Sequence, residues 1–246
     1  MDPLTISAAS GMRSRLESLD MLANNLANAT APGYKNDIES YGLYMSDDVL
    51  AEGMDVDPVT ARLPVIERQW TNFSQGLLHE TGNPLDVAIS GEGFFTVQGR
   101  EGIVYTRNGR FHLGGDGSVL TQDGFRVMRT DGVPLQATGS GAIQIGADGT
   151  VTQGGEALGR LAIARFADPH ELRKAGAGNY KARSTPQPAT GAELLQGRTE
   201  GSNVNTPESS IRLISVMRHF EMLTKAVQLN SEMNRKATSE VAKVNP

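Results

Sequence analysis

The sequence predicts an α+β fold, with a coiled-coil-forming helix at each end and a β-rich domain between them. Near both ends, apolar residues recur at alternating spacings of three and four, the pattern of a helix that packs along a narrow seam. In between, short apolar runs are separated by Asp-Gly pairs, which is typical of strands joined by tight turns. We therefore expect three parts: an N-terminal helical segment at 1–35, a β-rich middle domain with linkers at 36–203, and a C-terminal helical segment at 204–246.

The first helix is expected from Pro3 to Asn28. Proline suits the first turn of a helix, and the pair Pro32-Gly33 breaks the pattern afterwards, with Gly33 expected to adopt a positive φ. Three asparagines near its end either cap the helix locally or bond to neighbouring chains. The asparagines are Asn24, Asn25 and Asn28. The apolar seam of this helix consists of Ala9, Met12, Leu16, Leu19, Ala23 and Leu26.

The middle domain is expected to contain many short strands, as in a meander, a sandwich or a partly open barrel. Asp-Gly pairs lie between many of them, and glycine there supplies the positive φ that hairpin turns require. Two stretches are interpreted as linkers, Ser46–Pro64 and Ala182–Gly191. The strands are expected at residues 86–89, 93–97, 103–106, 117–120, 125–128, 142–145, 150–152 and 161–164.

The last helix is expected to begin at Thr206-Pro207, with Thr206 as its cap and Pro207 in the first helical position. Asn203 and Asn205 just before it are interpreted as turn and cap residues. Within the seam, Asn230 and Asn234 either fix the register of the helix against a partner or face solvent. The seam consists of Leu213, Val216, Phe220, Leu223, Val227, Asn230, Asn234, Ala237, Val241 and Val244.

Composition excludes several classes of function. The chain has 246 residues, a net charge of −5 and no cysteine. An acidic chain without a basic cluster is not typical of nucleic-acid binding or of attachment to an anionic membrane, and no apolar run is long enough to insert into a bilayer. Without cysteine there are no disulfides, thiolate metal sites or cysteine nucleophiles. The first 26 residues hold charged side chains where a cleavable secretory signal would be uninterruptedly apolar.

No constellation of residues indicates chemistry, so we expect no enzyme and no catalytic, cofactor-binding or metal site. The four histidines are not at metal-ligand spacings. Gly91-Glu92-Gly93 lacks the third glycine of a dinucleotide fingerprint. The alternative is a peptidoglycan-binding or hydrolytic β-domain with helical anchors, for which Asp86 and Glu92 are the only carboxylate pair within a motif.

The two narrow seams require partners, since packing supplies most of the stability of a helix. These partners are each other, in an antiparallel pair within one chain, the middle domain, or neighbouring subunits. Contacts between subunits that do not close a ring generate helical filaments.

Four long motifs resemble the bacterial flagellar rod and hook family. They cover both ends and the middle of the chain: 24–35 (NNLANATAPGYK), 83–95 (NPLDVAISGEGFF), 105–111 (YTRNGRF) and 200–205 (EGSNVN). Within the family, 218–222 (RHFEM) is more similar to proximal-rod members, whereas 91–95 is closer to the distal-rod pattern. The proximal-rod type is favoured, with the distal-rod type second.

The resemblance implies a structural subunit of the flagellar basal-body rod, the drive shaft that spans the periplasm and transmits torque to the hook. Such proteins pair their terminal helices in an inner tube, hold a β-rich domain outside it, and leave the cell through the flagellar type III export channel without a cleaved signal. The implied partners are other rod and hook-family subunits and further copies of this chain. The candidate interface comprises Leu16, Leu19, Ala23, Asn24, Asn25, Leu26, Asn28, Leu213, Val216, Phe220, Leu223, Val227 and Asn230.

Overall fold

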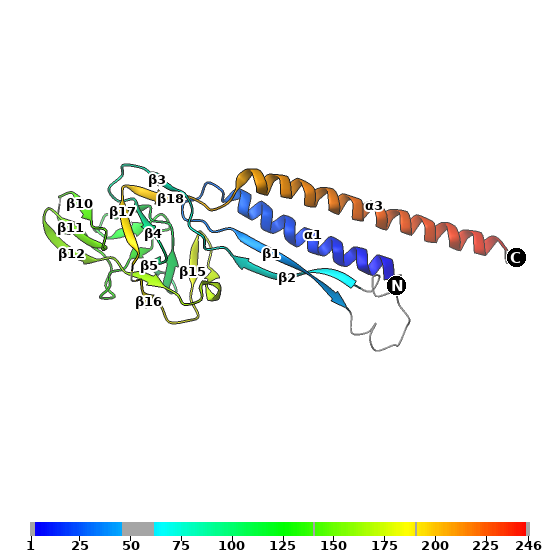
Figure 1. Cartoon of the computed structure of the whole chain (residues 1–246), viewed down its shortest axis with the longest axis horizontal. Coiled ribbons are helices and arrows are strands. Elements are labelled where there is room, and N and C mark those ends of the chain that lie inside the picture. Colours follow the sequence, from blue (N-terminus) through cyan, green and yellow to red (C-terminus); the bar gives the residue numbers. More distant parts are fainter. Residues whose placement is uncertain (1–2, 46–61, 140, 190, 245–246) are drawn as a thin grey trace. The chain divides into compact units, whose positions relative to one another are not determined.

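The computed structural model describes residues 3–45, 62–139, 141–189 and 191–244 (Figure 1). They form two compact units, each assembled from segments that are far apart in the sequence. Unit 1 contains the described residues of Met1–Ala27, Asp37–Trp70 and Asn205–Pro246. Unit 2 contains Asn28–Asn36 and the described residues of Thr71–Val204. The predicted middle segment at 36–203 therefore contributes residues to both units.

Unit 1 combines the two terminal helices with a β-hairpin. Helices α1 (Pro3–Ala27) and α3 (Thr206–Val244) lie side by side and antiparallel, as Figure 1 shows, and confirm the helix predicted at each end. Strands β1 (Asp37–Met45) and β2 (Arg62–Thr71) form a two-stranded sheet. The predicted linker Ser46–Pro64 lies outside the described residues at 46–61, and its last three residues belong to β2. Neither of the described helices has a stretch apolar enough to span a membrane.

The start of α3 differs by one residue from the prediction. The side-chain Oδ1 of Asn205 accepts a hydrogen bond from the backbone N–H of Glu208 at 3.4 Å, and the Asn205 carbonyl accepts one from Ser209 at 2.9 Å. Asn205, rather than Thr206, is therefore the cap of α3. An amide side chain reaches the exposed N–H groups of the first turn as readily as a hydroxyl does, so the sequence offered two caps in succession.

Unit 2 is built of antiparallel strands. Every predicted strand overlaps an observed one. The largest sheet has the order β14-β15-β6-β5-β9-β8-β7, with β13 and β16 attached to it, and smaller sheets are β10-β11-β12, β17-β4 and β18-β3. The strands are β3 (Leu78–Glu80), β4 (Val87–Ser90), β5 (Phe94–Gly99), β6 (Gly102–Thr106), β7 (Phe111–Leu113), β8 (Val119–Thr121), β9 (Arg126–Val127), β10 (Ile143–Ile145), β11 (Thr150–Gln153), β12 (Glu156–Arg160), β13 (Ile163–Arg165), β14 (Arg173–Lys174), β15 (Asn179–Lys181), β16 (Gln187–Pro188), β17 (Glu193–Gln196) and β18 (Arg198–Glu200), with a 3₁₀ turn at Pro169–Glu171.

Two hydrophobic clusters stabilise unit 2, one on each side of strand β5. Because successive side chains of a strand point to opposite faces, neighbouring Phe94 and Phe95 enter different clusters. Phe95 packs edge-to-face on Phe111 within the larger, mainly aliphatic cluster. Phe94 belongs to an aromatic cluster with Tyr180, where ring edges meet ring faces. Strand β5 therefore ties the two clusters together.

The Asp-Gly pairs form the predicted turns. The glycines at 117, 124, 132 and 149 all have φ between +76° and +88°. In three of these turns the aspartate side chain also accepts a hydrogen bond from the backbone N–H two residues further on, at Ser118, Val133 and Thr150. These bonds favour the charged carboxylate. The pKa of Asp116, Asp131 and Asp148 therefore lies below the ordinary 3.8, through hydrogen bonds chiefly from Ser118, Arg129 and Thr150 respectively.

The three turn aspartates should make the stability of unit 2 fall in acid. A carboxyl whose pKa is lowered by folding stabilises the folded state above its unfolded pKa, and this contribution disappears as the pH falls through the folded value. We expect the melting temperature to decline below about pH 4. A variant with Asp116→Asn, Asp131→Asn and Asp148→Asn should show a shallower decline, measured by circular dichroism from pH 2.5 to 6.

The control is a variant that removes the same number of charges elsewhere, by Glu156→Gln, Glu171→Gln and Glu193→Gln. These carboxylates are exposed and accept no hydrogen bond within the described part of the chain. The control should keep the decline of the unaltered protein. Equal slopes for all three proteins would contradict a role for the turn carboxylates.

Candidate functional site

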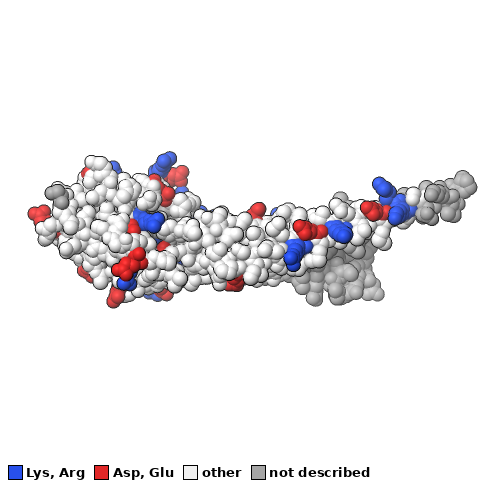
Figure 2. Space-filling model, turned by 90° about the horizontal axis from the view of Figure 1, so that it is seen from above, with Lys and Arg blue, Asp and Glu red and all other residues white. Residues whose placement is uncertain are grey.

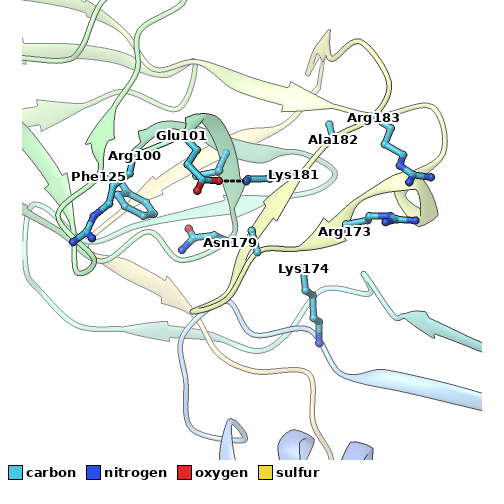
Figure 3. A pocket seen from close by; sticks show the side chains of 12 residues that line it. Arg100, Glu101, Phe125, Arg173, Lys174, Asn179, Lys181, Ala182 and Arg183 are labelled. Carbon is cyan, nitrogen blue, oxygen red and sulfur yellow. Dashed lines mark hydrogen bonds and ion pairs between the residues drawn. The ribbon is translucent and has the colours of Figure 1, made fainter.

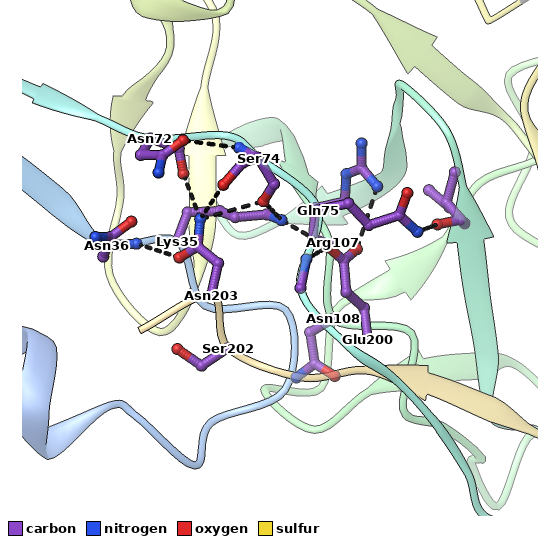
Figure 4. A network of polar contacts seen from close by, with 12 residues as sticks. Lys35, Asn36, Asn72, Ser74, Gln75, Arg107, Asn108, Glu200, Ser202 and Asn203 are labelled. Atoms are coloured by element: carbon purple, nitrogen blue, oxygen red, sulfur yellow. Dashed lines mark hydrogen bonds and ion pairs between the residues drawn. The ribbon is translucent and has the colours of Figure 1, made fainter. Parts of the chain in front are cut away.

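A buried triad of charged side chains lies in unit 2 and joins three of the motifs found in the sequence. The Glu200 carboxylate accepts a hydrogen bond from Lys35 Nζ at 2.6 Å and from an Arg107 guanidinium nitrogen at 3.2 Å (Figure 4). The side chains of Lys35 and Glu200 are fully buried, and that of Arg107 is 4% exposed. The triad therefore links residues 35, 107 and 200 at the interior of the unit.

The triad places two cations against one carboxylate, and backbone groups bind several of the remaining polar atoms, whereas the buried Arg107 Nε has no hydrogen-bond partner among the described residues. Lys35 also donates to the carbonyl of Ser74 at 2.6 Å, and Arg107 donates to the carbonyl of Gly91 at 2.8 Å. The Glu200 carboxylate accepts a third hydrogen bond, from the N–H of Gly76. Burial lowers the pKa of Lys35 and of Arg107, and the neighbouring carboxylate opposes both shifts.

Close backbone packing surrounds the triad. Gly33 has a positive φ of 68°, as expected, and its N–H donates to the Glu200 carbonyl at 2.8 Å. A Cβ atom at Gly33 would lie 2.4 Å from the backbone of Arg107 and Asn108, so only glycine fits. The turn that follows α1 is thus packed directly on the strand-end backbone that carries Arg107.

Asn203 holds three chain segments together beside the triad. Its Oδ1 accepts from the backbone N–H of Asn36 at 2.8 Å, and its Nδ2 donates to the Asn72 carbonyl at 2.8 Å and to Ser74 (Figure 4). The Asn72 N–H in turn donates to the Asn36 carbonyl. Residues 36, 72 and 203 each lie within two residues of a point where the chain passes between units. The sequence indicated only a turn residue here.

In unit 1, Glu39 on β1 performs a similar joining role. Its Oε1 accepts hydrogen bonds from Ser18 of α1 at 2.6 Å, from Tyr41 at 2.8 Å and from Arg212 of α3 at 2.9 Å. Asn25 of α1 adds a pair of hydrogen bonds to the backbone of Asp37. Both helices are therefore fixed to β1 by polar side chains.

The first two predicted seam residues of α3, Leu213 and Val216, face α1. Val216 is 5% exposed and packs with Met21 and Leu22 of α1, and Leu213 and Leu19 lie against this cluster. Phe220, Leu223, Val227 and Asn230 are partly buried, whereas Asn234 and Ala237 are exposed, and the side chains of Val241 and Val244 are outside the described part.

On α1 the buried face is shifted from the predicted seam. Leu16, Ala23 and Asn24 are exposed, Leu26 and Asn28 are partly buried, and Asn25 is buried. The face that α1 does bury is rich in small and polar residues, which a search for large apolar side chains overlooks. It comprises Ala8, Gly11, Ser14, Ser18, Met21, Leu22 and Asn25.

A second set of apolar side chains on α3 points away from the seam. Ile211, Met222, Leu229 and Met233 are separated by 11, 7 and 4 residues, which places them on one side of the helix. With Ile214 and Met217 they are between 48% and 70% exposed. Unit 1 therefore leaves one apolar face of α3, and Leu16 of α1, uncovered within the described residues.

The carboxylates of the alternative hypothesis have separate environments. Asp86 is buried and accepts a hydrogen bond from Asn83 at 3.1 Å. Glu92 is exposed and pairs with Arg165 at 2.7 Å. Among the described residues, no three His, Asp or Glu side chains come close enough together to hold a metal ion.

Comparison with known proteins agrees with the motifs. The chain matches a model described as "Flagella basal body rod protein" at residues 7–35, one described as "Flagellar hook protein FlgE/F/G D1 domain" at 88–153, and one described as "Flagellar basal body rod FlgEFG protein C-terminal" at 195–240. It is 34% identical to the flagellar basal-body rod protein FlgF of Caulobacter vibrioides, covering 92% of this chain and 93% of the relative. It is 31% identical to FlgG of Agrobacterium fabrum, covering 92% and 94%.

The triad predicts an unequal cost for removing its members. Glu200→Gln leaves two buried cations without a carboxylate, and breaking a buried pair in this way costs about 3–5 kcal/mol. Lys35→Met should cost less, because Arg107 still pairs with Glu200 in a neutral arrangement. Urea unfolding followed by the β-sheet signal in circular dichroism measures both.

Glu101→Gln is the control, since Glu101 forms an exposed pair with Lys181 and should leave the unfolding midpoint almost unchanged. If Lys35→Met lowered the free energy of unfolding as much as Glu200→Gln, the excess positive charge left by Glu200→Gln would not be the cause of its destabilisation.

Proposed function

The chain belongs to the flagellar basal-body rod and hook protein family, and we propose that its terminal helices are the surfaces through which it joins its neighbours in the rod. It is a structural subunit of the rod. The observation that carries the assembly proposal is the exposed apolar face of α3, defined by Ile211, Met222, Leu229 and Met233. Exposed apolar surface of this kind marks a site of protein association.

The helix pair of one chain buries little apolar surface by itself. Among the described side chains, its cluster consists of three buried ones, Met21, Leu22 and Val216, with two more packed against it. Figure 2 shows charged side chains along α3 in small groups of mixed sign, separated by uncharged surface. Packing against other helices supplies most of the stability of such a helix. Neighbouring subunits are the partners that would supply it.

Pairing within a chain and pairing between chains use different faces of α3. The seam residues Val216 and Leu213 contact α1, whereas Leu229 and Met222 face the other way. A subunit can therefore keep its own helix pair and still present an apolar face to the next subunit. Because that face and the surface receiving it would be different, the contact would not close and would extend into a filament.

We assign the chain to the proximal type of rod subunit on the segment 218–222, whose sequence is similar to that of proximal-rod members. Its proposed partners are other rod and hook-family subunits and further copies of itself, in the part of the basal body that crosses the periplasm, reached through the flagellar export channel. We assign no catalytic role, since Asp86 and Glu92 are each engaged by a different partner.

Leu229→Asp tests the assembly proposal. Leu229 is 53% exposed, so the variant should fold like the unaltered protein. In the rod the change would remove a contact worth about 1.5–3 kcal/mol and bury an unpaired charge. We expect soluble protein with an unchanged circular dichroism spectrum, but few completed basal bodies and loss of swimming. Basal-body isolation and motility assays measure these outcomes.

Gln228→Asp is the matched control, because it places the same charge at an exposed position one residue away on the same helix. It should leave motility close to normal. Normal rods and swimming in Leu229→Asp cells would exclude this face of α3 from the assembly interface.

A further inference from the structure

Unit 2 contains a basic cavity that the assembly through the helices does not use. It has a volume of about 480 Å³ and lies between the turn joining β5 to β6 and the β14–β15 hairpin (Figure 3). Phe125 and Val104 supply apolar wall. One acidic side chain, Glu101, lines the cavity. The five cationic side chains that line it are Arg100, Arg173, Lys174, Lys181 and Arg183.

The arginines of the cavity are the cations with spare binding capacity. Lys181 is paired with Glu101 at 2.7 Å, and Lys174 lies over the ring of Tyr34 at 4.6 Å. The side chains of Arg173 and Arg183 form no hydrogen bond or ion pair with the described residues, and Figure 3 shows both guanidinium groups extending to the same side of the hairpin. Ten N–H donors in total are thus available for an anionic ligand.

The register of the hairpin adds an energetic argument. Arg173 lies directly opposite Lys181 across β14 and β15. Like charges at directly opposed positions destabilise a sheet. Glu101 pairs with Lys181 of this opposed pair and leaves the Arg173 side chain without an anion. A ligand carboxylate would supply one, and arginines bind carboxylates in a fork geometry that lysines lack.

The chain itself contains a segment of matching charge. Residues 47–57 hold Asp47, Asp48, Glu52, Asp55 and Asp57 and no lysine or arginine. The segment therefore carries a charge of −5, equal to the net charge of the whole chain, and the remaining residues balance to zero. Such a block of like charge is typical of an interaction segment.

The segment 47–57 follows β1, a strand of unit 1, whereas the cavity belongs to unit 2. Strand β1 begins where the chain leaves unit 2 and runs for nine residues before the segment begins. At about 3.3 Å per residue, that strand is about 30 Å long. We take the occupant to be the segment of a neighbouring copy, since copies of the subunit meet in the rod.

We propose that the basic cavity of Arg173 and Arg183 binds the acidic segment 47–57 of a neighbouring copy of this chain. The inference rests on the proposed function only in that copies of the subunit meet in the rod. It gives the assembly a second, electrostatic contact, separate from the apolar contact of α3, and one that salt weakens.

A peptide-binding measurement tests the proposal. The probe is a fluorescent synthetic peptide of residues 46–58, and the receptor is the full chain with its own five segment carboxylates changed to amides, so that they do not compete. We expect saturable binding by fluorescence anisotropy that is lost between 50 mM and 500 mM salt. Arg173→Glu with Arg183→Glu should weaken it by about tenfold or more.

Two matched controls separate a specific site from general attraction. Arg110→Glu with Arg198→Glu makes the same charge change at exposed residues outside the cavity and should leave the affinity within about twofold. The peptide with amides in place of its carboxylates should not bind. Equal loss in both charge-reversal variants, or binding of inorganic phosphate at the cavity without binding of the peptide, would overturn the proposal.

This assay needs no assembled rod. Its failure would leave the helix-mediated assembly intact, whereas normal rods in Leu229→Asp cells would remove the helix proposal and leave the cavity's affinity for the segment unchanged.

Discussion

The architecture of unit 2 depends on one buried carboxylate. Glu200 pairs with two cations that are both withdrawn from water, Lys35 from the N-terminal part of the sequence and Arg107 from its middle, and the triad keeps one excess positive charge. A buried ion pair of this kind adds little net stability, since desolvation offsets the attraction, but a chain that fails to form it leaves an uncompensated charge inside. The triad therefore acts mainly against wrong arrangements. It allows the turn after α1, the Arg107 backbone and the approach to α3 to meet in only one way.

The same reasoning explains what the sequence could predict. Periodicity is a local property, and it located both helices, while Asp-Gly pairs located the hairpin turns. The triad joins residues separated by up to 165 positions, and no local pattern pairs Lys35 with Glu200. All three members nevertheless lie in motifs that the resemblance singled out. The buried face of α1 was harder to predict from the sequence, because Gly11, Ser14 and Ser18 are buried by close approach and hydrogen bonding rather than by hydrophobicity.

The hairpin of β1 and β2 was also missed, for a different reason. Its residues mix aromatic, acidic and small side chains, so alternation of apolar and polar positions is weak. Its place is set by polar side chains of other elements, through Glu39 and the backbone of Asp37. Pairing of α1 with α3 and assembly with neighbours were alternatives at the level of sequence. In the structure, the seam residues Leu213 and Val216 pack against α1, while other apolar side chains of α3 remain exposed.

The discontinuity of unit 1 has a consequence for the order of events along the chain. Its first segment ends at Ala27 and its last begins at Asn205, so its two helices are the most widely separated partners in the molecule. Any process that threads the polypeptide from its N-terminus, whether synthesis or translocation, delivers α1 long before α3. Throughout that interval α1 has no helix of its own chain to pack against, while unit 2 can close once Glu200 has emerged. The contact of Met21 and Leu22 with Val216 therefore cannot form until nearly all of unit 2 has passed.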